Sequence, residues 1–201
     1  MEYEKLLKNL KNRGFDAYYC TNDEEAIQKT LDLIGNDSVG IGGSITVRDL
    51  GLYERLIERG NSVFWNWKVD DSQKDAMRRE AMRAQVYLCS ANALLVDGRV
   101  MNIDGTGNRV AATTFGPARV IMIIGKNKLV NSVDEGIEWT RKECCPQNAR
   151  RMNLKTPCAI TGKCTDCTAP DRMCNIISIF ERKPNGFKSF VVVFVDKELG
   201  L

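Results

Sequence analysis

The stretch Arg119-Val120-Ile121-Met122-Ile123-Ile124-Gly125 contains five consecutive apolar residues and ends at a glycine. An apolar run without polar alternation is typical of a parallel strand that is buried on both faces. Sheets of such strands are covered by helices on both sides, so this stretch favours an α/β fold.

Segments with strand and helix character alternate along the rest of the chain. Strands are expected at 15–20, 38–41, 62–67, 86–90, 176–180 and 190–195. Helical spacing of apolar residues precedes Gly14 and recurs within 26–34, 50–57, 70–85 and 133–139. Asp97-Gly98 lies between two apolar runs and predicts a hairpin. With no internal repeat or linker, residues 1–201 are expected to form one domain with a largely parallel sheet.

The amino-acid composition excludes several kinds of catalytic and metal site. The chain has 201 residues, eight cysteines, no histidine and a net charge of +3. Without histidine there is no Ser-His-Asp or Cys-His pair and no imidazole-bound zinc. Any proton transfer must use Asp, Glu, Lys, Tyr or Cys. The small net charge argues against a nucleic-acid partner.

The cellular setting follows from what the chain lacks. Its apolar runs are far shorter than the ~20 residues of a membrane span, and the N-terminus is charged, unlike a signal peptide. We therefore expect a cytoplasmic protein without a membrane partner, whose thiols stay reduced. Eight cysteines in that setting favour metal binding or redox chemistry over structural disulfides.

Four of the cysteines follow the pattern Cys158-x5-Cys164-x2-Cys167-x6-Cys174. They lie within 146–174, a polar segment without periodicity that is expected to be an inserted loop organised by a ligand. Four thiolates suit an iron–sulfur cluster of the [4Fe-4S] type or a structural zinc ion. Free buried cysteines or disulfides are the alternatives.

A glycine-rich segment, 40–46, joins an expected strand to an expected helix. Glycines let a ligand approach the backbone, and the start of a helix favours an anion. Gly42, Gly43, Ser44 and Thr46 are therefore candidate anion-binding residues. The alternative is a tight turn in which Ser44 or Thr46 only caps the helix.

A second polar turn, 102–109, places an acid, a hydroxyl, an amide and a guanidinium close together. Such a group can bind a carboxylate or phosphate and supply a base. The candidate binding residues are Gly105, Thr106, Gly107, Asn108 and Arg109, and Asp104 is the candidate base. A structural Asp–Arg pair is the alternative.

Two lysines, Lys126 and Lys128, directly follow the apolar strand at 119–125. Ligands of open α/β sheets bind beyond the carboxyl ends of the strands, so these lysines are well placed. A solvated surface pair explains them equally well. In the absence of histidine, proton transfer is assigned to Asp104 or Lys126.

Together, the segments 40–44, 91–93, 97–98, 102–111, 115–117 and 125–128 resemble the LUD domain family of lactate utilisation proteins. The resemblance implies a three-layer, Rossmann-like α/β fold related to ribose-5-phosphate isomerase and the CoA transferases. It also implies a cleft between the Gly-Gly-Ser loop and the Asp-Gly-Thr-Gly-Asn-Arg turn.

The family's best-known members oxidise L-lactate to pyruvate beside iron–sulfur subunits. The resemblance thus implies a role in organic-acid utilisation, with a small anionic substrate and redox partner subunits. The cysteines of 156–174 depart from small members of the family. A non-redox isomerase or transferase acting on a phosphorylated or acyl substrate, with structural zinc, is one alternative. A non-catalytic assembly subunit is another, and self-association into a homo-oligomer is left open.

Overall fold

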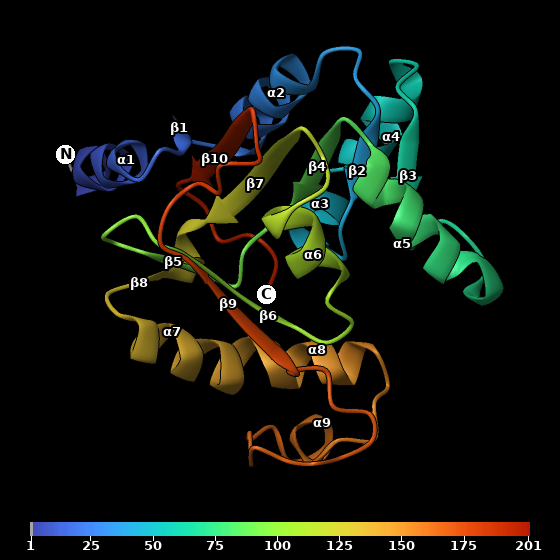
Figure 1. Ribbon diagram of the computed structural model, residues 1–201. Helices are drawn as coiled ribbons and strands as arrows, with labels where there is room; N and C mark the ends of the chain where they lie inside the picture. Colours follow the sequence, from blue (N-terminus) through green and yellow to red (C-terminus); the bar gives the residue numbers. More distant parts are fainter. Residues whose placement is uncertain (1) are drawn as a thin grey trace.

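The computed structural model of the chain describes residues 2–201 and is built around a six-stranded sheet (Figure 1). All neighbouring strands of this sheet pair in parallel. Their spatial order is β1 (Asp16–Cys20), β10 (Ser189–Val195), β7 (Arg119–Gly125), β4 (Val86–Cys89), β2 (Val39–Ile41) and β3 (Val63–Trp65). The predicted α/β fold with a largely parallel sheet is confirmed.

Strand β7 lies inside the sheet, between β10 and β4. Ile121 and Ile123 point into one apolar core, whereas Val120, Met122 and Ile124 point into the other. Successive side chains of a strand point to opposite faces. Burial on both faces therefore explains why this stretch is apolar at every position.

Helices cover both faces of the sheet. One core receives side chains from α2 (Asp23–Ile34), α3 (Ile45–Asp49) and α4 (Leu52–Glu58). The other receives them from α1 (Glu2–Asn12), α5 (Lys74–Arg83) and α6 (Asn108–Thr114). The result is the expected three-layer, Rossmann-like arrangement (Figure 1). Among residues 2–201, no helix combines the length and apolar character needed to cross a membrane.

A second, four-stranded sheet lies beside the first and was not expected from the sequence. Its order is β8 (Leu129–Val130), β5 (Ala93–Leu95), β6 (Val100–Asp104) and β9 (Ile176–Phe180). Strands β5 and β6 form the predicted hairpin, with Gly98 in the left-handed region at φ 89°. Helix α7 (Val133–Trp139) packs against this sheet through a small third core.

Two segments expected as single helices are divided. In the segment 50–57, Leu50 is the C-cap of α3 and α4 begins only at Leu52, after Gly51, a residue with φ 62°. The segment 70–85 begins with a 3₁₀ turn, η1 (Asp71–Gln73), before α5 starts. Neither division changes which face of the sheet is covered.

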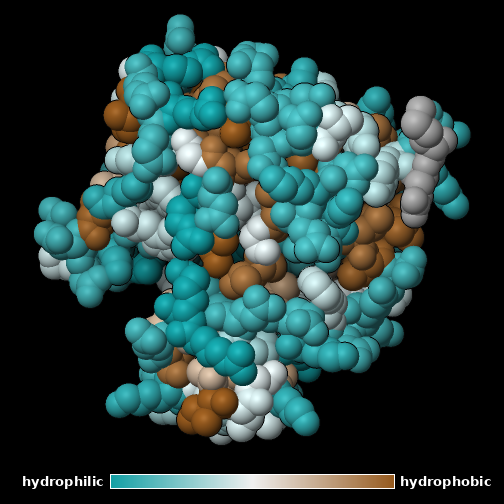
Figure 2. Space-filling view, turned by 180° about the vertical axis from the view of Figure 1, so that it is seen from behind, coloured by the Kyte–Doolittle hydropathy of each residue, from teal (hydrophilic) through white to brown (hydrophobic). Residues whose placement is uncertain are grey.

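The prediction that all of 146–174 is loop was wrong. Helix α7 continues through a π-helical turn, η3 (Thr140–Cys144), into α8 (Cys145–Arg151), and α9 (Pro157–Thr161) follows. Pro146 directly follows the π-helical turn, where the regular hydrogen bonding of this continuous helix is already interrupted, so its missing N–H is tolerated. Residues 162–175 contain no helix or strand. With α9 they form a lobe at the foot of the molecule, which Figure 2 shows from behind, set off by a notch.

The close approach of α5 to β2 requires glycine at position 40. A Cβ atom at Gly40 would lie 1.9 Å from the carbonyl oxygen of Ala81. We expect Gly40→Ala to lower the free energy of unfolding by about 3 kcal/mol, measured by urea denaturation, because backbone must move.

The matched control is Gly43→Ala. Its Cβ would make an ordinary contact with the Trp67 ring at 3.6 Å. A change of less than about 1 kcal/mol is expected for this control. Equal losses in the two variants would contradict the proposed contact between α5 and β2.

Candidate functional site

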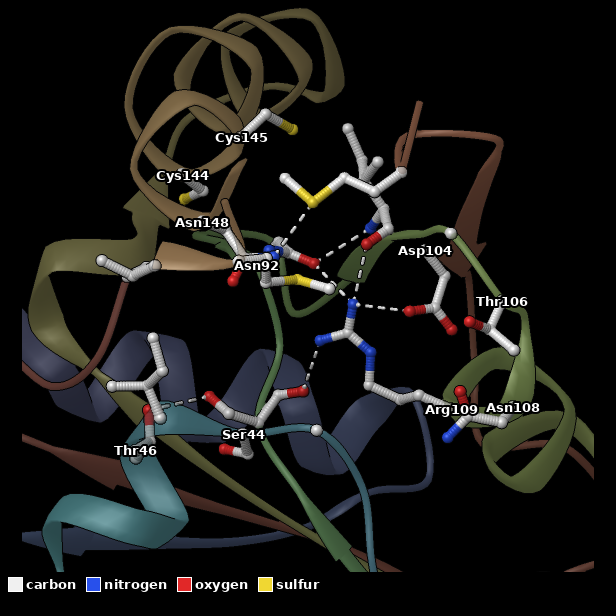
Figure 3. A pocket seen from close by; sticks show the side chains of 18 of the residues that line it. Ser44, Thr46, Asn92, Asp104, Thr106, Asn108, Arg109, Cys144, Cys145 and Asn148 are labelled. Atoms are coloured by element: carbon white, nitrogen blue, oxygen red, sulfur yellow. Dashed lines mark hydrogen bonds and ion pairs between the residues drawn. The ribbon is translucent and has the colours of Figure 1, made fainter. Parts of the chain in front are cut away.

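A pocket of about 210 Å³ opens at the carboxyl ends of three neighbouring strands. Strand β2 leads into Gly43 and Ser44, β4 leads into Ser90, and β7 leads into Lys128. The opposite walls come from the end of β6 and from α8 (Figure 3). Ligands of parallel α/β sheets bind at this edge.

The glycine-rich loop serves both as a turn and as a pocket wall. Ser44 caps α3, because its Oγ accepts a hydrogen bond from the Val47 N–H at 3.2 Å. Gly43, Ser44 and Thr46 also line the pocket. Gly42 lies behind the loop, where a Cβ would come within 2.9 Å of the Tyr87 hydroxyl. The cap expected at Ser44 is therefore present, and anion binding by this loop stays a prediction.

Arg109 occupies the middle of the site, between Asp104 and Asn92 (Figure 3). Its guanidinium donates to the Ile103 carbonyl and to Asn92 Oδ1, both at 2.8 Å, and to the Ser90 carbonyl at 3.3 Å. Only 11% of its side chain is exposed. Its Nε is buried without a hydrogen-bond partner among the described residues. All three of these acceptors are neutral, so among the described residues the charge of Arg109 is balanced by Asp104 alone.

Asp104 is the carboxylate that faces this guanidinium. Its Oδ1 lies 3.4 Å from an Arg109 nitrogen, and its Oδ2 accepts a hydrogen bond from the Val110 N–H at 3.1 Å. Gly105, Thr106 and Asn108 line the pocket beside it. Gly107 adopts φ 88° and begins α6. The predicted Asp–Arg pair therefore exists, and it forms part of the pocket wall.

Lys128 brings a second cation into the pocket. It ends the 3₁₀ turn η2 (Lys126–Lys128), and only 3% of it is exposed. Its Nζ donates to Ser90 Oγ at 3.0 Å and to Thr46 Oγ1 at 3.4 Å. Among the described residues it forms no ion pair with a carboxylate. Burial lowers the pKa of Lys128 to about 8, and the charge of Arg109 acts in the same direction.

Lys126, the lysine assigned to proton transfer from the sequence, lies outside the pocket. Its Nζ pairs with Asp196 Oδ1 at 3.1 Å, and 45% of its side chain is exposed. The hydrogen bond to Asp196 raises the pKa of Lys126. The structure thus brings Lys128 to Asp104 and Arg109, and it leaves Lys126 at the surface.

The wall formed by η3 and α8 was missed in the sequence. Cys144, Cys145, Asn148, Arg151 and Met152 line the pocket from this side. Cys145, Asn148 and Arg151 are three residues apart, so they share one face of a helix. That spacing is the signal that could have identified them once Pro146 was assigned to a first helical turn.

The four cysteines of the foot lobe are free and partly exposed. Arg172 holds two of them in place by donating to the carbonyl oxygens of Cys167 and Cys174. The Asp166 N–H points at Cys164 Sγ at 3.5 Å. Burial raises the pKa of Cys174, and the neighbouring thiols of Cys164, Cys167 and Cys158 raise it further. The four thiols therefore share one electrostatic environment.

This donor set suits a metal centre in its chemistry. All four candidate ligands are thiols, and N–H groups directed at sulfur are typical of thiolate-bound clusters. In the part of the chain that the structure describes, no three cysteine or carboxylate side chains converge closely enough to hold one ion. The assignment of Cys158, Cys164, Cys167 and Cys174 as ligands stays a prediction.

The foot lobe is connected directly to the pocket. The Asn175 N–H donates to the Asp104 carbonyl at 2.9 Å, and Asn148 Nδ2 donates to the Met173 sulfur at 3.1 Å. A Cβ at Gly105 would lie 2.9 Å from the Met173 carbonyl oxygen, so the two backbones are in contact. The residues next to Cys174 thus support the turn that carries Asp104.

Comparisons with known proteins agree with this architecture. The family model described as the LUD domain matches residues 3–195. The chain is also similar to the crystal structure of a DUF162 family protein from Deinococcus radiodurans. That match has a TM-score of 0.57 and 12% sequence identity over 96% of each chain, so it shows the fold alone. A search of curated proteins finds none that matches.

The buried amine of Lys128 should lower the stability of the fold. Its folded pKa of about 8 lies below the ordinary 10.5, so the folded state disfavours the proton. At pH 7 we expect Lys128→Met to raise the free energy of unfolding by up to about 3 kcal/mol. Urea denaturation measures this change.

The gain should depend on pH. Between about pH 8 and 10.5 the unfolded chain binds a proton at Lys128 that the folded chain releases, so wild-type stability rises toward that of the variant. Lys126→Met, which removes an exposed ion pair, should change stability by less than about 1 kcal/mol. A loss of stability in Lys128→Met at pH 7 would contradict an uncompensated buried cation.

Proposed function

Because the chain belongs to the LUD domain family, we propose that it acts in organic-acid utilisation and binds the carboxylate of a 2-hydroxy acid such as L-lactate. The observation that carries this proposal is Lys128, a buried ammonium group without a carboxylate partner among residues 2–201. An anionic ligand is the partner that this group lacks.

The charges around the pocket support an anion. Lys128 and Arg109 contribute two positive charges to its interior, whereas Asp104 contributes one negative charge. A buried charge is costly unless it is paired, so a bound carboxylate stabilises the charged form of Lys128. The hydroxyls of Ser90 and Thr46 accept hydrogen bonds from this ammonium group and hold it at the base of the pocket.

Asp104 is placed to act on the hydroxyl of the same ligand. It lines the pocket with 15% of its side chain exposed. Arg109 and the Val110 N–H fix the orientation of its carboxylate. In this proposal Lys128 binds the carboxylate of the acid. Asp104, the candidate base, accepts a hydrogen bond from its hydroxyl group.

The foot lobe supplies the second part of the proposal. Cys158, Cys164, Cys167 and Cys174 would hold an iron–sulfur cluster or a zinc ion, and Arg172 beside them offsets the negative charge of thiolates. A cluster would carry electrons to a redox partner subunit, whereas zinc would hold the lobe folded. The contacts of Met173 and Asn175 with the 104–105 turn support a link between this centre and the pocket.

Binding of L-lactate by calorimetry tests the pocket. The affinity of the wild-type protein should be constant between about pH 5 and 7, where the lactate carboxylate is ionised and Lys128 is protonated. It should fall as pH rises through about 8, because Lys128 then loses its proton. Lys128→Met should weaken binding at pH 7 by about tenfold or more.

Lys126→Met is the matched control, since it removes an equal charge two residues away and outside the pocket. It should leave both the affinity and its pH dependence unchanged. Equal effects of the two lysine variants, or no binding of any small organic acid, would overturn the proposed site.

Metal and sulfide analysis after anaerobic purification tests the foot lobe. We expect iron with acid-labile sulfide, or zinc, bound in the wild-type protein and lost in Cys167→Ser. Cys20→Ser, at a buried cysteine in β1, should retain the metal. Iron with sulfide would support the redox role, and zinc would restrict the centre to a structural role. A metal-free wild-type protein would contradict the ligand set.

A further inference from the structure

The pocket has a second positively charged region, at its rim. Arg151, at the end of α8, is exposed, and its guanidinium lies 4.9 Å from the centre of the Trp67 ring. Arg78 of α5 lines the same pocket. Lys128 is buried at the base, so the pocket runs from a buried cation to the exposed Arg151 and the part-buried Arg78.

No carboxylate of the described residues pairs with Arg151, which is held by an amide group. Its Nε and one terminal nitrogen donate to Asn148 Oδ1, at 3.1 and 2.7 Å. Asn148 is itself fixed through its amide hydrogen bond to the Met173 sulfur. The nearby charge of Arg48 adds to partial burial in lowering the pKa of Arg151. A cation that is oriented by an amide, stacked on a tryptophan and close to a like charge is prepared for an anion.

Lactate cannot satisfy both ends of this pocket. Its one carboxylate pairs with the cation at the base or with the cation at the rim. Its methyl group carries no charge, so the remaining cation stays without an anionic partner. A ligand with a carboxylate at one end and a second anionic group at the other pairs with Lys128 and Arg151 together. The cavity of about 210 Å³ has room for more than a three-carbon acid.

We propose that the preferred ligand is a 2-hydroxy acid that carries a second anionic group, which Arg151 binds against Trp67 at the pocket rim. Arg78 also lines the pocket, and its partner Asp75 is largely exposed, so this ion pair can open toward a ligand. This inference rests on the proposed function, since it assumes that the base of the pocket binds the carboxylate.

Calorimetry with three probes at one ionic strength tests the inference. L-lactate has no second anion, 2-hydroxyglutarate has a carboxylate, and 3-phosphoglycerate has a phosphate. We expect the last two to bind at least about tenfold more tightly than lactate. The tighter of the two identifies whether the second group is a carboxylate or a phosphate.

Arg151→Met keeps an apolar side chain on Trp67 but removes the charge. It should reduce the ratio of the two-anion affinity to the lactate affinity to about one. Arg79→Met removes an equal charge from an exposed position next to Arg78 and should leave the ratio unchanged.

The outcomes separate the two proposals. Lactate binding that depends on Lys128, with no advantage for either two-anion probe, would overturn this inference and leave the proposed function standing. If Arg151→Met still binds the two-anion probes more tightly than lactate by the same factor as the wild-type protein, the inference is also overturned. If none of the three probes binds, the proposed function fails with it.

Discussion

Strand β7 is held between two apolar cores, and this burial determines where the polar groups of the pocket lie. Its neighbours β10 and β4 pair with it in parallel, and β2 pairs in parallel with β4. Helices that connect parallel strands cover both faces of their sheet, so β7 is buried on each side. Parallel strands bring their carboxyl ends to one edge. Ser44, Ser90 and Lys128 therefore meet there, although they are far apart in the chain.

The pocket combines groups that stabilise the fold with one that does not. Arg109 is bonded to backbone carbonyls, to Asn92 and to Asp104, so it joins β4, β6 and α6 into one unit. Within residues 2–201, the partners of the buried charge of Lys128 are two hydroxyl groups. A residue that lowers the stability of the fold and lines a cavity is typical of a ligand-binding site. The foot lobe, which supports the Asp104 turn, extends the same unit.

Sequence patterns predicted those features whose structure depends on residues close together in the chain. The apolar run at 119–125 indicated a buried parallel strand, and Asp97-Gly98 indicated the hairpin. The turn 104–109 indicated an ion pair between Asp104 and Arg109. Lys126 and Lys128 could not be told apart, because their environments depend on Asp196 and Ser90, which are distant in sequence. The second sheet was not predicted for the same reason, because its strand β9 pairs with β6, which lies more than seventy residues earlier in the sequence.

The order of strands in the main sheet also governs how the chain can fold as it is made. Strand β10, the last to be synthesised, is inserted between β1, the first, and β7. A ribosome-bound chain can pair β7 with β4 and β2 early, but β1 has no neighbour in the sheet until β10 has emerged. Such long-range pairing slows folding and leaves strand edges open to aggregation in the meantime. A truncation that removes Ser189–Val195 would therefore leave β1 without a neighbouring strand among those that the structure describes.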